Sequence, residues 1–272
     1  MNYEFINTEF NSQKLNLYSA LLSLVFPDTK KYTPKFLNWQ YNLNPNGKVL
    51  GYDAFLNNEL AGHYVTIPVQ YIFNGVLLKG LLSLNTAIHP HHQGKGLFTQ
   101  LAQKTYAHAS ELGYEFVIGV ANQNSTPGFL NKLQFKLISP LAVEVFMGKP
   151  QLKPVPENFM KSVWDIESAK WRLKNPAAGY IKNNLCITTK THISLIHAVM
   201  SVRKEIFSDG LDEHTSFLKM TIGLNNKNKF KINLPSVLKP SPLNLIFKPL
   251  NNFKAEINSS NLFFELIDFD AY

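Results

Sequence analysis

The sequence predicts a mixed α/β fold, in which a mostly antiparallel sheet is flanked by helices. Three observations lead to this class. Apolar residues recur at helical spacing over 13–25, an Asn74-Gly75 hairpin signal separates two apolar runs, and a strand–helix–strand order extends over 79–120. Together they favour a meander of strands followed by a helical crossover.

The elements of the N-terminal half follow from local signals. A helix is expected over Gln13–Val25, and a second begins at Thr33-Pro34, a cap followed by proline in the first turn. The turn residues Asn44-Pro45-Asn46-Gly47 end that helix. Strands are then expected over 49–56, 60–68, 69–73, 76–78 and 79–88, a helix over 97–112, a strand over 116–120, a short helix over 126–133 and strands over 135–147.

A proline-rich linker divides the chain. Three prolines fall within Pro150–Pro156, so we expect one domain over 1–148 and a smaller α/β domain over 149–272. In the second part the patterns predict strands near Leu185–Thr189, His192–Val202 and Leu262–Phe269, and a helix near Thr215–Leu224.

Two segments suggest a weak internal duplication. Trp171–Pro176 resembles Trp39–Pro45, although it is one residue shorter, and both precede apparent strand pairs. The second half lacks any Gln-x-x-Gly loop. If it is a degenerate copy, we expect a single cofactor site per chain.

Composition sets the class of protein. Apolar residues make up 45% of the 272 residues and charged residues 17%, which is typical of a globular chain. No apolar run reaches the roughly 18–20 residues that a membrane span needs, so no membrane insertion is expected. The N-terminal residues show no secretory pattern, and the single cysteine, Cys186, excludes an internal disulfide. We therefore expect a cytoplasmic protein, either a monomer or a homodimer, with Cys186 buried in a strand.

The formal charge of +8 favours anionic partners such as nucleic acid, a phosphorylated cofactor or a membrane surface. The basic residues are scattered, and no zinc-finger, recognition-helix or RNA-binding signature accompanies them. Nucleic acid is therefore not an expected partner.

The segment from Leu81 to Phe135 carries the chemistry. A strand leads into His89-Pro90-His91-His92, then into Gln93-Gly94-Lys95-Gly96-Leu97-Phe98 and a helix. Gly94 and Gly96 allow a tight turn, and the free amides of the first helical turn favour a phosphate. The chain has no Gly-Lys-Ser or Gly-Lys-Thr ending and no GxGxxG, so a P-loop and a Rossmann unit are excluded.

This segment resembles the acyl-coenzyme A site of the GNAT superfamily, the Gcn5-related N-acetyltransferases. The family signature is Gln/Arg-x-x-Gly-x-Gly/Ala, and Gln93–Phe98 matches it except that Phe98 replaces the final small residue. A second hallmark, strand, Asn, short helix and Gly-Phe, is similar to 116–135, with Gln134-Phe135 at the Gly-Phe position. The resemblance covers roughly Leu15 to Met147 and implies a GNAT-type fold.

The resemblance also implies a donor and its contacts. The donor is acetyl-coenzyme A or another acyl-coenzyme A, and no metal is expected. The amides of Gln93, Gly94, Lys95, Gly96, Leu97 and Phe98 would hold the pyrophosphate, Ala87 and Ile88 the pantetheine, and Asn124 the cofactor arm. In many relatives a tyrosine at the position of Leu130 acts as the general acid that protonates the leaving thiolate. This usual proton donor is missing here.

The base that deprotonates the acceptor amine is left open by the sequence. An alkyl amine is mostly protonated near neutral pH, so a base or a water relay has to remove a proton. The candidates are histidines, His89 first and then His91 and His92, because imidazole titrates near neutrality. Asn85 and Thr86 are expected to orient a water, and the Ile88 amide to face the oxyanion. Carboxylates of the tail, Asp268 and Asp270, are a further possibility.

Trp39 and Tyr41 lie where relatives build the acceptor site, although core packing is the alternative for Trp39. The leading hypothesis is an N-acetyltransferase that acts on a small-molecule amine, such as a nucleotide-linked amino sugar. An aminoglycoside or an amino acid is an alternative acceptor. A non-catalytic acyl-coenzyme A sensor is the alternative from another class.

Overall fold

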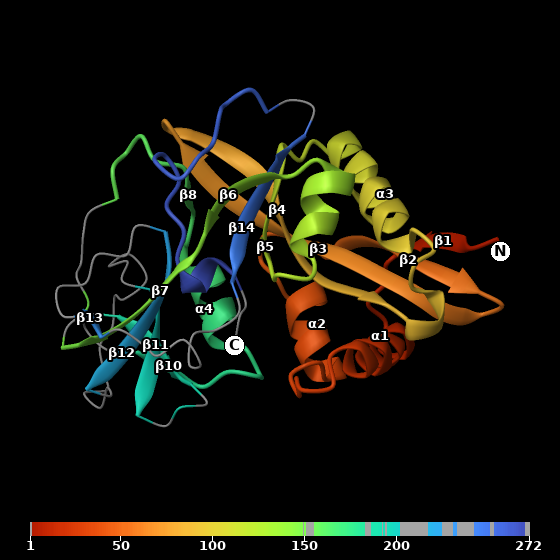
Figure 1. Cartoon of the computed structure of the whole chain (residues 1–272), viewed down its shortest axis with the longest axis horizontal. Coiled ribbons are helices and arrows are strands. Elements are labelled where there is room, and N and C mark those ends of the chain that lie inside the picture. The colour runs from red at the N-terminus through yellow and green to blue at the C-terminus, as the bar shows by residue number, and fades with distance from the viewer. Residues whose placement is uncertain are drawn as a thin grey trace.

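The computed structural model describes most of the chain as two β-sheets with helices packed around them (Figure 1). The described residues are 2–148, 150, 155–182, 186–191, 193, 195–201, 217–224, 231–232, 242–250 and 253–269. Within them, no helix is both long and apolar enough to cross a membrane.

The helices of the N-terminal half begin at the caps that the sequence indicates. Helix α1 spans Ser12–Val25, and the Asn11 side chain accepts a hydrogen bond from the Lys14 amide. Helix α2 spans Pro34–Asn42, and Thr33 caps it in the same way. Helix α3 spans Leu97–Glu111 and starts after Gly96. The three helices predicted at these places are confirmed.

The first sheet has the order β1-β2-β3-β4-β5-β14-β6, with the short strand β8 (Lys161–Ser162) paired to β3. The strands of this path are β1 (Glu4–Asn7), β2 (Leu50–Leu56), β3 (Glu59–Phe73), β4 (Val76–Ile88), β5 (Phe116–Ala121), β14 (Asn244–Pro249) and β6 (Lys136–Pro140). The division of 60–73 and of 76–88 into two strands each was wrong, because both run unbroken. Pro68 is tolerated within β3 because β2 ends opposite Thr66 and the pairing with β8 begins only at Tyr71, so neither strand takes a backbone donor from Pro68.

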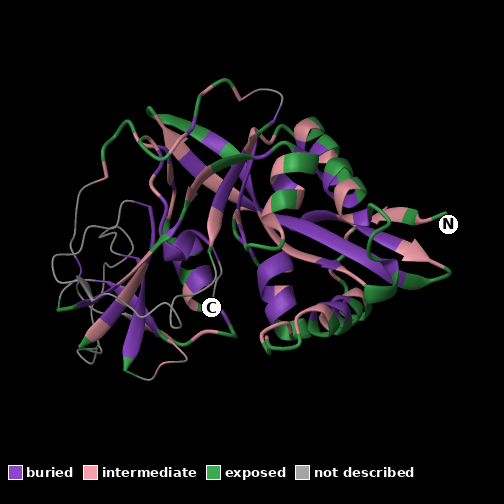
Figure 2. Cartoon of the chain, viewed as in Figure 1, coloured by how far each residue is buried: buried purple, intermediate pink, exposed green. Residues whose placement is uncertain are grey.

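Apolar residues cover both faces of this sheet, so a helical layer packs on each (Figure 2). On one face α3 contributes Leu101 and Ala102, which pack with Tyr64 of β3. On the other face α1 and α2 contribute Tyr18, Leu22 and other buried residues to the larger core. The central strands are consequently buried along most of their length, which fixes their register and holds the site rigidly.

The second sheet has the order β13-β7-β12-β11-β10-β9. Its strands are β13 (Lys231–Ile232), β7 (Ala142–Met147), β12 (Leu218–Gly223), β11 (Ile196–Ser201), β10 (Ile187–Lys190) and β9 (Tyr180–Lys182). Helix α4 (Ile166–Leu173) precedes β9, and Cys186 is buried just before β10. The parallel partner of β11 in this sheet is β12.

Two element predictions for the C-terminal half were wrong. The helix expected near Thr215–Leu224 is strand β12, because β7 and β11 pair with it on both sides and this pairing outweighs the local pattern. The strand expected near Leu262–Phe269 instead contains a short 3₁₀ helix at Leu266–Asp268. Its geometry is fixed by a capping box, in which the Asp268 carboxylate accepts from the Glu265 amide.

The two sheets exchange one strand each. Strand β14, drawn in blue in Figure 1, lies between β5 and β6, antiparallel to both. Strand β7 comes directly after β6 in the chain but lies between β12 and β13 of the other sheet, again antiparallel to both. The boundary expected at residue 148 stays a prediction about domains, while the sheets themselves are interleaved across it.

Helix, strand order and turn chemistry repeat in the two halves, in agreement with the suggested duplication. Each half has a helix, three antiparallel strands, a fourth strand parallel to the third, and an outer strand beyond the exchanged one. The Asn-Pro turns match as well. The Asn44 side chain accepts from the Asn46 amide at 3.1 Å, and the Asn175 side chain accepts from the Ala177 amide at 2.9 Å.

Candidate active site

Strands β4 and β5 separate within the first sheet. They are paired in parallel only where Gly80–Ser83 faces Phe116–Gly119. Beyond Ser83, β4 continues along β3 as far as Ile88, while β5 ends at Ala121. On the side where β5 has ended, the backbone groups of the last β4 residues, including Ala87 and Ile88, are therefore not paired with β5.

A bulge in β4 lies at this divergence. The register passes from Val65 opposite Leu84 to His63 opposite Ala87, so Asn85 and Thr86 together face the single residue between. Asn85 has φ +46°, a left-handed conformation that asparagine tolerates better than most residues. The bulge directs the Asn85 carboxamide toward α2, where it hydrogen-bonds Gln40 and Tyr41.

The loop before α3 has the geometry of an anion cradle. Gly94 and Gly96 have φ +74° and +75°, so both need the freedom of glycine. No side chain caps the helix at Gly96, and within the described residues the amides of Gly94, Leu97 and Phe98 form no hydrogen bond. Free amides and the helix dipole together favour a phosphate at this point.

Side chains around this loop define its rim. Lys95 Nζ donates to the His91 carbonyl at 2.9 Å, and Gln93 Nε2 donates to the Ile88 carbonyl at 3.4 Å. A cavity of about 470 Å³ lies beside the loop, lined by Asn2, Tyr3, Phe5, Lys95 and Gln100. Lys95 is thus the residue of the loop that also lines this cavity.

The diverging ends of β4 and β5 are the two sides of what we call the cleft. Its second side begins after β5. Asn122 accepts from the Ser125 amide and hydroxyl and thereby fixes the turn, whereas Asn124 is exposed at its tip. The short helix predicted over 126–133 follows and is confirmed, with a π-helical turn at Gly128–Lys132 within it. The Phe98 ring packs edge-on against Phe129 with centroids 5.1 Å apart, so the bulky residue of the signature bridges the two walls.

The predicted base His89 lies at the outer end of β4. Its Nε2 is 3.8 Å from the Glu59 carboxylate, and its Nδ1 accepts from the His91 amide at 3.3 Å. His92 is buried and pairs with the Tyr3 hydroxyl, and burial, together with Lys95, lowers the pKa of its imidazole. The ligand-type atoms of Glu59, His89 and His92 lie within 4.8 Å of one another. Within the part of the chain that the structure describes, the ring of His89 contacts Glu59 and the His91 amide and does not bond Asn85, so its role as base stays a prediction.

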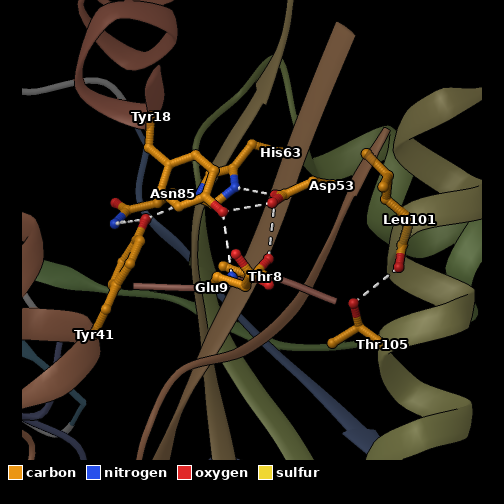
Figure 3. A network of polar contacts seen from close by, with 9 residues as sticks. All are labelled: Thr8, Glu9, Tyr18, Tyr41, Asp53, His63, Asn85, Leu101 and Thr105. Carbon is orange, nitrogen blue, oxygen red and sulfur yellow. Dashed lines mark hydrogen bonds and ion pairs between the residues drawn. The ribbon is translucent and has the colours of Figure 1, made fainter. Parts of the chain in front are cut away.

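A buried chain of polar side chains leads inward from Asn85 (Figure 3). Asn85 Nδ2 donates to the Tyr41 hydroxyl at 3.0 Å, and that hydroxyl lies 2.9 Å from His63 Nε2. His63 Nδ1 lies 2.6 Å from Asp53 Oδ1, and both side chains are fully buried. Four secondary-structure elements, β4, α2, β3 and β2, thus supply one residue each.

The surroundings of Asp53 fix the direction of these bonds. Tyr18 donates to Oδ2 at 2.5 Å and Thr8 to Oδ1 at 3.2 Å, so the carboxylate accepts from three side chains. An ionised carboxylate can only accept, so His63 carries a proton on Nδ1. In the neutral imidazole Nε2 then accepts from Tyr41. The Tyr18 ring stacks on the His63 ring with centroids 4.2 Å apart and so restricts the orientation of the imidazole. Burial, followed by the nearby Asp53 charge, raises the pKa of Tyr18 well above its ordinary value.

The other predicted site residues fall in different places. Tyr41 belongs to the buried chain, whereas Trp39 stacks on Trp171 in the core. Asp268 is buried and bonds Ser162 and Trp164, which is a structural role. Asp270 lies outside the described residues.

Asp53 and His63 were not among the residues expected from sequence. The signal was present, because Asp53 interrupts the apolar strand Leu50–Leu56 and His63 alternates with Ala61 and Val65 on one face. A charged residue inside a buried strand requires a partner. The sequence did not show that the partner of Asp53 is His63, because the two residues are ten positions apart.

Known families and solved structures indicate the class of protein to which this fold and site belong. Residues 9–138 match the family model described as an acetyltransferase (GNAT) domain. Residues 9–138, just under half of the chain, therefore form a GNAT acetyltransferase domain. None of the curated proteins compared with it is similar in sequence.

Solved structures resemble the chain over nearly its whole length. A probable N-acyltransferase from Enterococcus faecalis has a TM-score of 0.62 at 9% identity, covering 92% of this chain and 73% of that one. A GCN5-related N-acetyltransferase from Anabaena variabilis has 0.59 at 12%, covering 91% and 73%. A putative acetyltransferase from Pyrococcus horikoshii has 0.53 at 9%, covering 92% and 90%. At these identities the likeness establishes the fold, including the second sheet.

Proposed function

We propose that this protein is an N-acyltransferase that moves an acetyl or other short acyl group from acyl-coenzyme A to the amine of a small molecule. One observation carries the proposal. The cleft between β4 and β5 ends at a loop whose two left-handed glycines and free helix amides suit a pyrophosphate. Glycine adopts this left-handed conformation without strain, so the backbone of the loop can approach a phosphate closely.

In this proposal each part of acyl-coenzyme A has its own contacts in the cleft. The amides from Gly94 to Phe98 hold the pyrophosphate, with Lys95 and the neighbouring cavity beside it. Backbone groups of Ala87 and Ile88 pair with the pantetheine along the edge of β4 that β5 has left. The thioester then lies near the bulge at Asn85, where the acceptor amine attacks its carbonyl carbon directly.

The acceptor that we propose is anionic, in the class of nucleotide-linked amino sugars. Support comes from a cavity of about 460 Å³ between α2 and α4, which Trp39, Trp171 and three lysines help to line. The lysines are Lys35, Lys170 and Lys174, and they outnumber the one carboxylate of the lining, Glu167, which pairs with Lys170 at 3.3 Å. Lysines favour phosphate, and indole edges suit a base or sugar. The same helix α2 presents Tyr41 to Asn85, so one helix links this cavity to the bulge.

Calorimetric titration of acetyl-coenzyme A into the wild type and into Gly96→Glu tests the donor site. The substitution places a carboxylate in the cradle, so we expect micromolar binding by the wild type and loss of at least about tenfold in affinity by the variant. Gly113→Glu is the matched control. Gly113 also has positive φ, +80°, with open space around it, at the far end of α3.

Thiol release with a panel of amines then tests the reaction. Faster release with nucleotide-linked amino sugars than with aminoglycosides or amino acids supports the anionic acceptor. Binding without release from any amine would favour an acyl-coenzyme A sensor instead. No binding by the wild type, with acetyl or longer acyl chains, would refute the donor site.

A further inference from the structure

We propose that Asp53, His63 and Tyr41 form a proton relay that accepts the proton of the acceptor amine. This inference rests on the proposed function. The three side chains come from β2, β3 and α2, and they are linked in order by contacts of 2.6 Å and 2.9 Å. Asn85, at the bulge of β4, is the half-exposed end of the chain and the point nearest to solvent.

The hydrogen bonds run in one direction along this chain. Tyr41 accepts from Asn85 and donates to His63 Nε2, and His63 Nδ1 donates to Asp53. A hydroxyl that donates to an imidazole, which in turn donates to a buried carboxylate, is the arrangement by which a histidine base acts through a hydroxyl. Asp53 keeps three donors in total, so it holds the imidazole without itself needing a proton.

The step balances without any further reactant. As the amine nitrogen bonds to the thioester carbon and the C–S bond breaks, one N–H proton moves toward Tyr41 by way of a water beside Asn85, because the Tyr41 hydroxyl is fully buried. The Tyr41 proton moves to His63 Nε2 at the same time. His63 then carries a positive charge against Asp53, until the proton returns by the same path to the thiolate. The products are the amide and the free thiol.

Burial distinguishes this relay from the pair of His89 and Glu59 at the outer end of β4. Glu59 beside His89 is largely solvent-exposed and its contact is 3.8 Å, whereas the side chains of Asp53 and His63 are fully buried. A buried carboxylate and imidazole are costly to desolvate and need a complete set of partners. Four elements of the fold converge to supply that set, and the only half-exposed member among the four linked residues lies at the proposed acyl site.

Tyr41→Phe is the principal test, because it removes one oxygen and keeps the ring. General base catalysis is worth about 10²- to 10⁴-fold, so kcat with the best amine should fall by at least about 100-fold. Acetyl-coenzyme A affinity should stay within about twofold of the wild type, since the donor site is untouched. Tyr106→Phe is the matched control, because it also loses a buried hydroxyl, bonded to Tyr64 at 2.5 Å, outside the relay.

The pH profile separates a relay from a structural role. Protonation of the amine lowers kcat at acidic pH in every variant, and a protonated imidazole, which cannot accept a proton, should add a further acidic loss in the wild type. Tyr41→Phe should keep only the loss that the amine imposes, while Tyr106→Phe should follow the wild type. Asp53→Asn, which removes the charge at similar size, is the second variant and should lower kcat comparably. A folded Tyr41→Phe with wild-type kcat and pH profile overturns the relay alone. A wild type that binds acetyl-coenzyme A but releases no thiol with any amine overturns the proposed function and the relay together.

Discussion

The indoles of Trp39 and Trp171 stack with centroids 4.7 Å apart, and each donates its N–H to the backbone carbonyl of the other, at 2.8 Å and 3.0 Å. The two residues occupy equivalent positions in α2 and α4, the helices that directly precede the three antiparallel strands of each half. Their contact is reciprocal, as expected about a local two-fold axis. Because α2 also carries Tyr41, this pairing links the C-terminal half to the candidate active site.

Replacing either indole by phenylalanine should destabilise the protein by about 1–3 kcal/mol, because a buried carbonyl loses its donor. The two changes should also be coupled by about 0.5–1.5 kcal/mol, the range for aromatic pairs. Urea unfolding of Trp39→Phe, Trp171→Phe and the double variant measures both quantities. Strictly additive costs would mean that the two residues do not act as a pair.

A fragment of residues 1–148 should not fold on its own. It lacks β14, whose residues Leu245, Ile246 and Phe247 are buried between β5 and β6. Without them two strand edges and an apolar face are left open, which favours aggregation. Circular dichroism and limited proteolysis of the fragment, beside the full chain, measure this. A soluble fragment with a cooperative melt would instead support an independent domain ending at residue 148.

Tyr18→Phe should cost about 1–3 kcal/mol of stability, because Asp53 Oδ2 loses its donor within the described residues. Burial and the Asp53 charge raise the pKa of Tyr18, so the hydroxyl stays a donor throughout the accessible range and the cost should not vary with pH. The bond from His63 to Asp53 remains. We therefore expect kcat to change by less than about tenfold, much less than in Tyr41→Phe. Unfolding and turnover of the same preparation give both values.

Asp165 at the start of α4 should make stability depend on pH in the acidic range. The Ser168 amide, bonded at 2.7 Å, is the main cause that lowers the pKa of this carboxyl below 3.8. Between the lowered pKa and the unfolded value, the unfolded chain binds more protons, so stability rises with pH and is lost as pH falls through the folded pKa. Asp165→Asn keeps the cap acceptor and should remove this dependence.

The matched variant Asp165→Ala should cost about 1 kcal/mol at neutral pH, because it removes the cap altogether. Urea unfolding at pH 7 and at about pH 3, near the ordinary pKa of aspartate, gives the comparison. An Asn variant with the pH dependence of the wild type would assign that dependence to another carboxyl.

Local signals predicted the N-terminal half well. Caps at Asn11 and Thr33, the Asn74-Gly75 turn and the helix after Gly96 all lie where the residues indicate. The same reasoning failed at 215–224, because strand pairing on both sides, which no local pattern reports, turns that segment into β12. The sequence also placed the candidate base among the histidines before the glycine loop, which stays a prediction, because an imidazole near the loop was visible in the sequence and one facing Asp53 was not.

The sequence by itself determined the fold class, the glycine loop and the family that these imply, since each depends on residues close together in the chain. Tertiary structure alone decided the exchange of β7 and β14 and the meeting of Asp53, His63, Tyr41 and Asn85. These contacts join residues up to well over a hundred positions apart. Their geometry depends on sheet register and on which face each helix covers, and both are set when the whole chain packs.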